Sequence, residues 1–248
     1  YGCDGLIENT IITYNSAGSG AGAISDSAVS IYNSVIMQNT GDSVGGINNC
    51  SGEIVNCTIV DNNIGLALSA LSNCNNTIKN CIIWGNGDNI VDQLTGCSLP
   101  SYCCIQNFAD AGNNGNIADV PGLTNDYFLS AGSPCIEAGD PTTVIENGQK
   151  DIGDGERLLS ARVDIGADEY GGIINVDTNA TGSNNGASWV NAYHHLQDAL
   201  DVVTSGQEIW VAAGTYYPDE DSINSDETGG LEHTKGDLTE TFQLVSGV

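Results

Sequence analysis

The chain has 248 residues, of which 40% are hydrophobic, and it carries 32 acidic residues against 5 basic ones. A formal charge of -27 repels polyanions, so nucleic acid and anionic membrane surfaces are excluded as expected partners. No apolar run reaches the roughly 18 residues that a membrane-spanning helix needs, so we expect no membrane span. Because the sequence begins at Tyr1 without Met or a signal peptide, we expect it to be a piece of a longer polypeptide.

The first third of the chain repeats one motif, Ile-x-Asn-x-x-Ile-x-x-Asn. The motif occupies residues 7–15, 31–39, 54–62 and 78–86. Short β-branched segments at this period, without a leucine scaffold or a helical pattern, predict an all-β parallel β-helix with coils of about 22 to 24 residues. Each motif position then becomes a column of side chains about 4.8 Å apart.

Alternation along the strands predicts which columns face the interior. We expect three inward columns: Ile7, Ile31, Ile54 and Ile78; Ile12, Ile36, Ile59 and Ile83; Ile24, Ile47 and Leu68. Two apolar columns should face outward: Ile11, Val35, Thr58 and Ile82; Thr13, Met37, Val60 and Trp84. Because so much apolar surface is unfavourable in water, we expect another segment, residues 110–172, to pack over these two columns.

Asparagine recurs at two bends of every coil. The two predicted ladders are Asn9, Asn33, Asn56 and Asn80, and Asn15, Asn39, Asn62 and Asn86. Asn tolerates the left-handed backbone of a sharp bend, and its amide can bond the bent backbone and the same Asn one coil away. We therefore interpret both ladders as structural rather than as ligand contacts.

Nine cysteines, without a zinc-site spacing, favour an oxidising extracellular or cell-surface location. Cys57 and Cys81 share an inward column and Cys50 and Cys74 another, where stacked residues are either bridged or free thiols. The predicted disulfide joins Cys97 to Cys103 or Cys104, which lie in a looser turn.

With these repeats, the chain resembles the right-handed parallel β-helix repeat proteins of bacterial surfaces. The segments NDYFLSAGSPCIEAGDP (125–141) and KDIGDGERLLSARVDIGADEYGG (150–172) are similar to the closing module called choice-of-anchor Q. The following residues resemble the opening of another such β-helix. The resemblance implies coils in 1–107, a closing module in 108–172, and the start of a second β-helix in 173–248.

A helix over residues 188–203 is predicted to cap that second β-helix. Ser188 is a suitable N-cap, Gly206 a suitable stop, and an apolar stripe joins them: Trp189, Tyr193, Leu196, Leu200 and Val203. We expect the first β-helix to have no cap of its own.

The coils offer few groups for catalysis. Lys79 is their one basic residue, and the carboxylates of Asp26, Asp42, Asp61, Asp88 and Asp92 fall in different columns. We therefore predict no catalytic residues and no cofactor. Calcium is an alternative ligand for an acidic run that fails the EF-hand spacing, with candidates Asp219, Asp221, Asp226 and Glu227.

These features favour a non-enzymatic, secreted structural protein that self-associates head to tail into a filament or surface matrix. Two alternatives stay open. One is an adhesin or glycan-binding module, with Tyr32 and Trp84 as sugar platforms, and the other is a polysaccharide lyase or hydrolase fragment.

Overall fold

The computed structural model describes residues 4–62, 69–87, 93–130, 132–146, 148–153, 155–159, 162–186, 189–203 and 207–217. The chain divides into two compact units, Tyr1–Tyr170 and Gly171–Val248. Each unit is described by itself.

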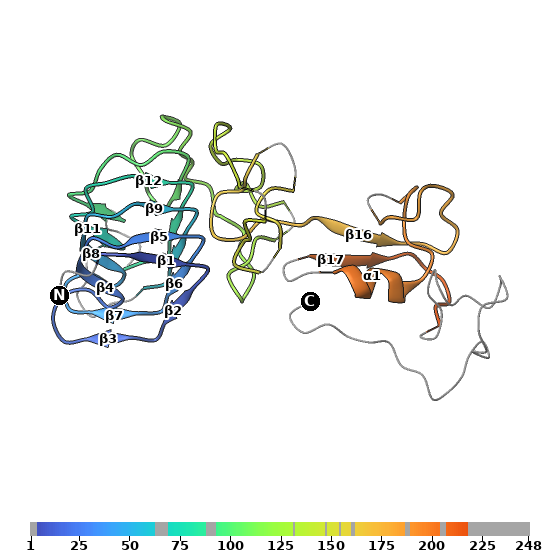
Figure 1. Ribbon diagram of the computed structural model, residues 1–248, viewed down its shortest axis with the longest axis horizontal. Coiled ribbons are helices and arrows are strands. Elements are labelled where there is room, and N and C mark those ends of the chain that lie inside the picture. Colours follow the sequence, from blue (N-terminus) through green and yellow to red (C-terminus); the bar gives the residue numbers. More distant parts are fainter. Residues whose placement is uncertain are drawn as a thin grey trace. The chain divides into compact units, whose positions relative to one another are not determined.

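The first unit begins with a stack of coils whose strands form three parallel sheets (Figure 1). The first sheet contains β1 (Leu6–Glu8), β5 (Ser30–Tyr32), β9 (Ile54–Val55) and β12 (Ile78–Lys79). The second contains β2 (Ile11–Thr13), β6 (Val35–Met37), β10 (Thr58–Val60), β13 (Ile82–Trp84) and β15 (Cys104–Ile105). The third contains β4 (Ile24–Ser27), β8 (Ile47–Cys50), β11 (Leu71–Ser72) and β14 (Leu94–Thr95), and a separate short pair joins β3 (Ser16–Ala17) to β7 (Thr40–Gly41). The predicted all-β parallel β-helix is confirmed.

The strand register places the same motif position of each coil side by side. Ile31 pairs with Ile54, and Ile36 with Ile59, and all four side chains are fully buried. The third column differs from the prediction because Ile47 pairs with Leu71 rather than with Leu68. Leu68 itself lies outside the described residues. All three columns pack into one apolar interior.

The far end of the coils is closed by the chain itself. Residues 106–117, which we call the end segment, follow β15 and lie across this end, where Phe108 packs against the apolar interior. The Asn116 side chain holds the segment in place, because its Oδ1 accepts the N–H of Cys103 at 3.0 Å and its Nδ2 donates to the Pro100 carbonyl at 2.9 Å. The expectation that the first β-helix lacks a cap is corrected in part: no described residue of this unit forms a helix, but the end segment packs one aromatic side chain against this end.

Residues 118–170, which we call the flanking segment, run beside the second sheet with little regular structure. Their apolar side chains form a second core with the outer face of the coils, in which Val60 and Ile82 meet Leu129 and Ile165. Gly166 fits against Ile82 because it has φ +117° and no side chain, whereas an added Cβ would lie 2.8 Å from the Ile82 side chain. The predicted cover over the outward apolar columns is confirmed at these positions, although Ile11 remains 55% exposed.

The second unit contains two parallel strands and a short helix. Strand β16 (Ile173–Val176) pairs with β17 (Glu208–Val211), and α1 (Leu196–Val202) packs against them through Ala199 and Val203. No helix among the described residues is long and apolar enough to cross a membrane.

The predicted helix over residues 188–203 is too long, since α1 begins only at Leu196. The backbone before it is bonded elsewhere: the Val190 carbonyl accepts from Gly182, and Tyr193 exchanges hydrogen bonds with Asn175 and Asp177. Residues 189–194 therefore form a loop, and Trp189 is 46% exposed. The predicted cap Ser188 and stop Gly206 lie outside the described residues.

Candidate functional site

The first coil leaves one end of the stack open. Strands β1, β2 and β4 each lie at the edge of their sheet, and no other described strand pairs with these edges. Edge strands of this kind present unpaired N–H and C=O groups to any additional strand. All three edges face the same direction because they belong to the same coil.

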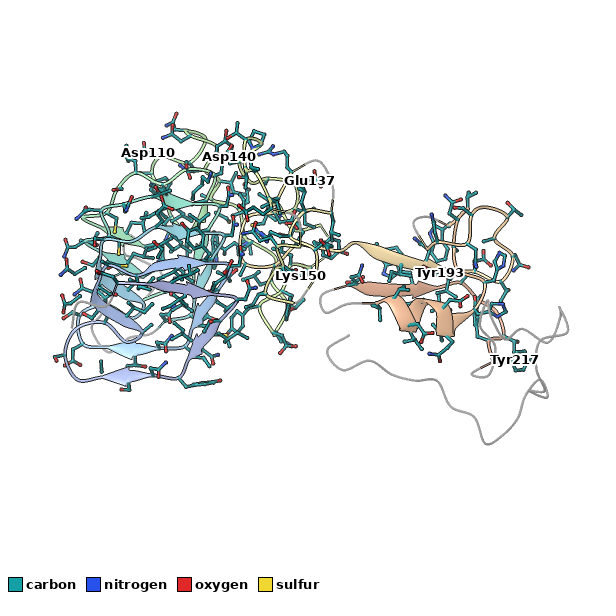
Figure 2. The ribbon with its side chains drawn as sticks, viewed as in Figure 1. Asp110, Glu137, Asp140, Lys150, Tyr193 and Tyr217 are labelled. Carbon is teal, nitrogen blue, oxygen red and sulfur yellow. The ribbon has the colours of Figure 1, made fainter. Side chains whose placement is uncertain are left out.

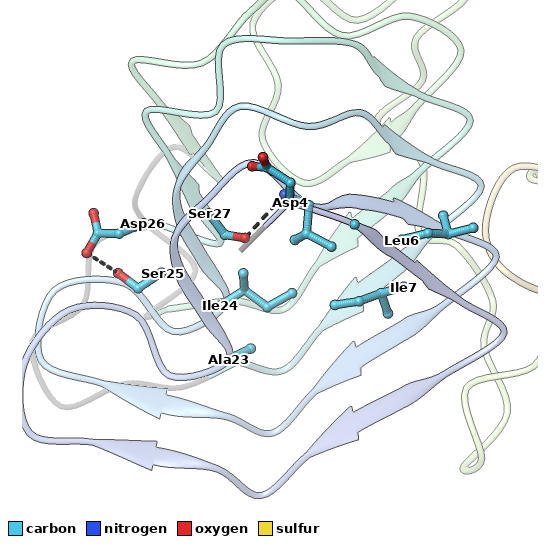
Figure 3. Close-up of a pocket in the computed structure, with 10 residues that line it drawn as sticks. Asp4, Leu6, Ile7, Ala23, Ile24, Ser25, Asp26 and Ser27 are labelled. Atoms are coloured by element: carbon cyan, nitrogen blue, oxygen red, sulfur yellow. Dashed lines mark hydrogen bonds between the residues drawn. The ribbon is translucent and has the colours of Figure 1, made fainter. Parts of the chain in front are cut away.

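A recess of about 420 Å³ opens at this end, between residues 4–7 and 23–29. Figure 3 shows Ile7 and Ile24 inside the outline of the coil, whereas Asp26 lies outside it. Ile7 and Ile24 are half-buried, while their neighbours one coil further, Ile31 and Ile47, are 0% exposed. The burial of each inward column is therefore completed by the next coil, and no described residue supplies this neighbour on the outer side of the first coil.

The second asparagine ladder runs through the coils as a continuous chain of hydrogen bonds. Asn15 Nδ2 donates to Asn39 Oδ1, Asn39 to Asn62, and Asn62 to Asn86, each at 2.9 Å. Each accepting Oδ1 also receives the backbone N–H of the same donor residue. The ladder ends on the buried Gln93, whose Oε1 accepts from Asn86 Nδ2 at 3.0 Å and whose Nε2 donates to the Asn86 carbonyl at 2.8 Å.

The first ladder is shorter than predicted. Asn80 Nδ2 donates to Asn56 Oδ1, and Asn56 Nδ2 to Asn33 Oδ1, both at 3.0 Å. Asn33 Nδ2 has no partner among the described residues, so Asn9 does not join the ladder. Asn9 lies in the first coil, where its side chain is exposed.

The residues with a left-handed backbone occupy different positions in the two ladders. In the first ladder the asparagines themselves are left-handed, with φ between 46° for Asn33 and 52° for Asn56. In the second ladder the left-handed residue comes one position before each Asn, as at Gln38 and Asp61. The prediction that Asn supplies the left-handed conformation therefore holds for the first ladder only.

The observed coils, ladders and sheets agree with a known family. Residues 1–112 match the right handed beta helix region. No curated protein and no solved structure matches the chain. The β-helix is thus right-handed as well as parallel, and the family model ends within the end segment that closes the stack.

The flanking segment of this β-helix protein contains a buried charge network that the sequence analysis did not single out. The Arg157 side chain is 0% exposed and lies 3.5 Å from Glu169 Oε2. Its guanidinium also donates to the backbone carbonyls of Asp164 and Asp168 at 3.2 and 3.0 Å. Arg157 thus holds together a loop that has no sheet or helix of its own.

Four buried carboxylates, Asp151, Asp164, Asp168 and Glu169, complete this network by accepting backbone N–H groups. Asp164 accepts from Glu137 and from Tyr170, both at 2.6 Å, and Asp168 accepts from Leu129 at 2.7 Å. Burial is the main cause that raises the pKa of Asp168 to about 7 and the pKa of Glu169 to about 8. The signal in the sequence was the acidic run VDIGADE. This run does not recur at a fixed spacing, so the sequence did not indicate which of its side chains are buried.

The predicted disulfide from Cys97 to Cys103 or Cys104 is not formed, since all three are free thiols. The structure separates them. Cys103 lies in the coil interior, where its Sγ accepts the N–H of Cys81 at 3.3 Å, and Cys104 faces the core of the flanking segment. Cys97 lies beside Cys74 instead, because β11 and β14 run in register.

The coil carboxylates that the structure describes are not brought together. Asp26 is exposed on β4, Asp42 is exposed in the bend after β7, Asp61 accepts a hydrogen bond from Tyr127, and Asp88 and Asp92 lie outside the described residues. The calcium candidates Asp219, Asp221, Asp226 and Glu227 also lie outside them. Among the residues that are described, no group of three His, Cys, Asp or Glu side chains could hold a metal ion.

The two predicted sugar platforms have different surroundings. The Tyr32 hydroxyl donates to Glu53. Trp84 lines a recess of about 220 Å³ together with Asp61, Tyr127 and the loop 120–124.

Proposed function

We propose that the chain is a non-enzymatic structural segment of an extracellular surface protein, in which the open first coil receives a coil from another copy. The observation that carries this proposal is the asymmetry of the stack. At the far end Phe108 packs against the interior and leaves a recess of about 150 Å³ beside Leu94, whereas at the near end three strand edges surround a recess of about 420 Å³ with half-buried Ile7 and Ile24. A coil of the same register would bury both side chains and pair the edges.

Two further features support this reading. The first two inward columns and the second ladder use the same residue in successive coils, and the third inward column uses Ile or Leu, so a further coil of the same motif fits without new chemistry. The apolar and backbone interactions at the end do not depend on charge, although the whole chain carries a formal charge of -27. Salt that screens this repulsion favours contact between copies.

The occupant of the open end would come from the second unit of another copy. That unit resembles the opening of a second β-helix, and its strands β16 and β17 are parallel, as coils require. Its candidate last coil, residues 241–248, lies outside the described residues. Contacts of this head-to-tail kind do not close on themselves and therefore propagate as a filament. Retention at the cell surface rests on the resemblance of residues 125–172 to the choice-of-anchor Q module.

Sedimentation velocity and negative-stain electron microscopy test the proposal on the whole chain. We expect elongated particles whose mass grows with protein concentration and persists at high salt. Ile24→Lys places a charge in the recess and should leave monomers, while Val144→Lys, at an 87% exposed position, should assemble normally. A thermal melt of both variants checks that they fold. A wild-type monomer at every salt concentration, or equal assembly of the two variants, contradicts the proposal.

Glycan binding is the second candidate, and the recess beside Trp84 favours it. An indole, the Tyr127 ring and the exposed carboxylate of Asp61 lie around one opening, and carbohydrate sites commonly combine an aromatic face with polar groups. Glycan-array binding that is lost in Trp84→Ala and kept in Ile24→Lys would support it. An array without any bound glycan would contradict it.

A further inference from the structure

The described cysteines fall into three groups that differ in their access to solvent. Cys57, Cys81 and Cys103 are buried in one column of the interior. Cys104 and Cys135 are buried in the core of the flanking segment. Cys50, Cys74 and Cys97 form the third group, and only Cys97 among these eight thiols is not buried.

Cys74 and Cys97 occupy the same position of successive coils. The register of β11 and β14 pairs Leu71 with Leu94 and Ser72 with Thr95, so two residues further along Cys74 lies beside Cys97. The Cys74 N–H donates to Cys97 Sγ at 3.4 Å, and the Ser98 N–H donates to the Cys74 carbonyl at 2.9 Å. Neighbouring residues of paired strands have Cα atoms about 4.8 Å apart, which falls within the range that a disulfide spans.

We propose that Cys97 and Cys74 form a redox-active dithiol, in which the partly exposed Cys97 attacks a low-molecular-weight disulfide and Cys74 resolves the product into a disulfide between coils. The site goes beyond the proposed assembly function and involves neither the open end nor the flanking segment. Its substrate class is a small disulfide such as oxidised glutathione.

The two thiols differ in the way that this exchange requires. The hydrogen bond from the Cys74 side chain lowers the pKa of Cys97 to about 7, while the same bond and then burial raise the pKa of Cys74. Cys97 therefore supplies the thiolate near neutral pH, and Cys74 keeps its proton. A thiol whose pKa lies near the ambient pH attacks disulfides fastest.

The exchange proceeds in two displacements. The Cys97 thiolate forms a bond to one sulfur of the small disulfide, whose S–S bond breaks and releases one thiolate. The Cys74 sulfur then attacks Cys97 Sγ, the mixed disulfide breaks, and the proton of Cys74 leaves with the second small thiol. Two protein thiols are oxidised by two electrons, and one small disulfide is reduced to two thiols.

Serine variants provide matched tests because serine already occupies both cysteine columns. Ser27 pairs with Cys50 in the column of Cys74, and Ser34 precedes Cys57 in the other column, where Thr58 is bonded to the Ser34 carbonyl. Cys97→Ser and Cys74→Ser therefore test the site. Cys57→Ser is the control, because Cys57 stacks in the same way in a column whose thiols are buried from solvent.

The reduced whole chain is incubated with oxidised glutathione, alkylated, and digested with trypsin and chymotrypsin. Cleavage after Lys79 and Trp84 places Cys74 and Cys97 in separate peptides, so a bridge appears as a cross-linked pair by mass spectrometry. We expect this pair in the wild type and in Cys57→Ser. We expect Cys74→Ser to accumulate glutathione on Cys97, and Cys97→Ser to lose both products.

Three outcomes would overturn the proposal. The first is a Cys97 that stays glutathionylated in the wild type, because Cys74 would then not resolve it. The second is a different bridge, such as Cys50 to Cys74 or Cys104 to Cys135. The third is a wild-type chain in which both Cys74 and Cys97 stay reduced in oxidised glutathione.

Discussion

Asn80 Oδ1 accepts the backbone N–H of Asp140 at 2.8 Å, and this bond is one of those that join the first asparagine ladder to the flanking segment. Its Nδ2 meanwhile donates to Asn56 in the coil below and to the Thr143 hydroxyl at 3.2 Å. The neighbouring Lys79 forms an ion pair with Asp140 at 3.2 Å. Figure 2 shows Asp140 and Glu137 in the flanking segment beside the coils. Asn80 thus uses the same amide to end a ladder and to dock a loop.

Removing the Asn80 side chain should loosen the flanking segment. Asn80→Gly keeps the left-handed φ of 51° but leaves the partly buried N–H of Asp140 without its acceptor. We expect a loss of about 1–3 kcal/mol in the free energy of unfolding and faster hydrogen exchange in residues 137–143. Asn73→Gly is the control, because Asn73 has φ 52° and is exposed. Equal exchange in the two variants would show that Asn80 does not hold the segment.

The middle of the second ladder should be more sensitive still. Asn62→Ala removes the side-chain partner of the Asn39 N–H and of the Ile36 carbonyl in the coil interior, whereas Asn86 Oδ1 keeps the backbone N–H of residue 62. Since each unsatisfied buried group costs about 1–3 kcal/mol, we expect a total loss of about 2–4 kcal/mol, measured by urea unfolding. The exposed Asn75→Ala should change the free energy of unfolding by less than about 0.5 kcal/mol. If the ladder did not contribute to stability, Asn62→Ala and Asn75→Ala would unfold at similar urea concentrations.

The inward isoleucine columns carry the apolar stability of the coils. Ile59 is 0% exposed and lies between Ile36 and Ile83 in register. We expect Ile59→Ala to lower the free energy of unfolding by about 2–5 kcal/mol, because it removes buried methyl groups and leaves a cavity. The same type of truncation at Val144, which is 87% exposed, should have almost no effect in the same thermal melts. Comparable losses would mean that Ile59 does not face the interior.

The buried Asp168 predicts a pH dependence. Burial raises its pKa from the ordinary 3.8 to about 7 in the folded chain, so folding favours the protonated acid. The stability that protonation contributes is fully present below about pH 4 and is lost as the pH rises through about 7. We therefore expect the wild type to lose more stability between pH 5.5 and pH 8.5 than Asp168→Asn does, in denaturant titrations at both pH values. An identical change in both proteins would contradict this assignment.

The sequence specified the coils better than the flanking segment because the coils repeat. An inward Ile or a ladder Asn recurs at a fixed position, so the register of one coil predicts the next. Arg157 and Asp168 had no such guide, since their partners are backbone groups brought together by folding of an irregular loop. The neighbour of Cys97 was missed for another reason: the pairing of β14 with β11 places Cys97 beside Cys74, and the local spacing to Cys103 does not show this.

The ladder bonds span 24, 23 and 24 residues, and each joins identical side chains. A whole coil could therefore be inserted or deleted between any two rungs, and every amide would again find an amide at the same distance. A change of one or two residues inside a coil would instead turn an isoleucine outward and break a rung. Such a chain tolerates variation in length in units of one coil, so the reach of the protein can change by duplication of its own sequence, while the Phe108 end and the flanking segment remain attached to whichever coil comes last.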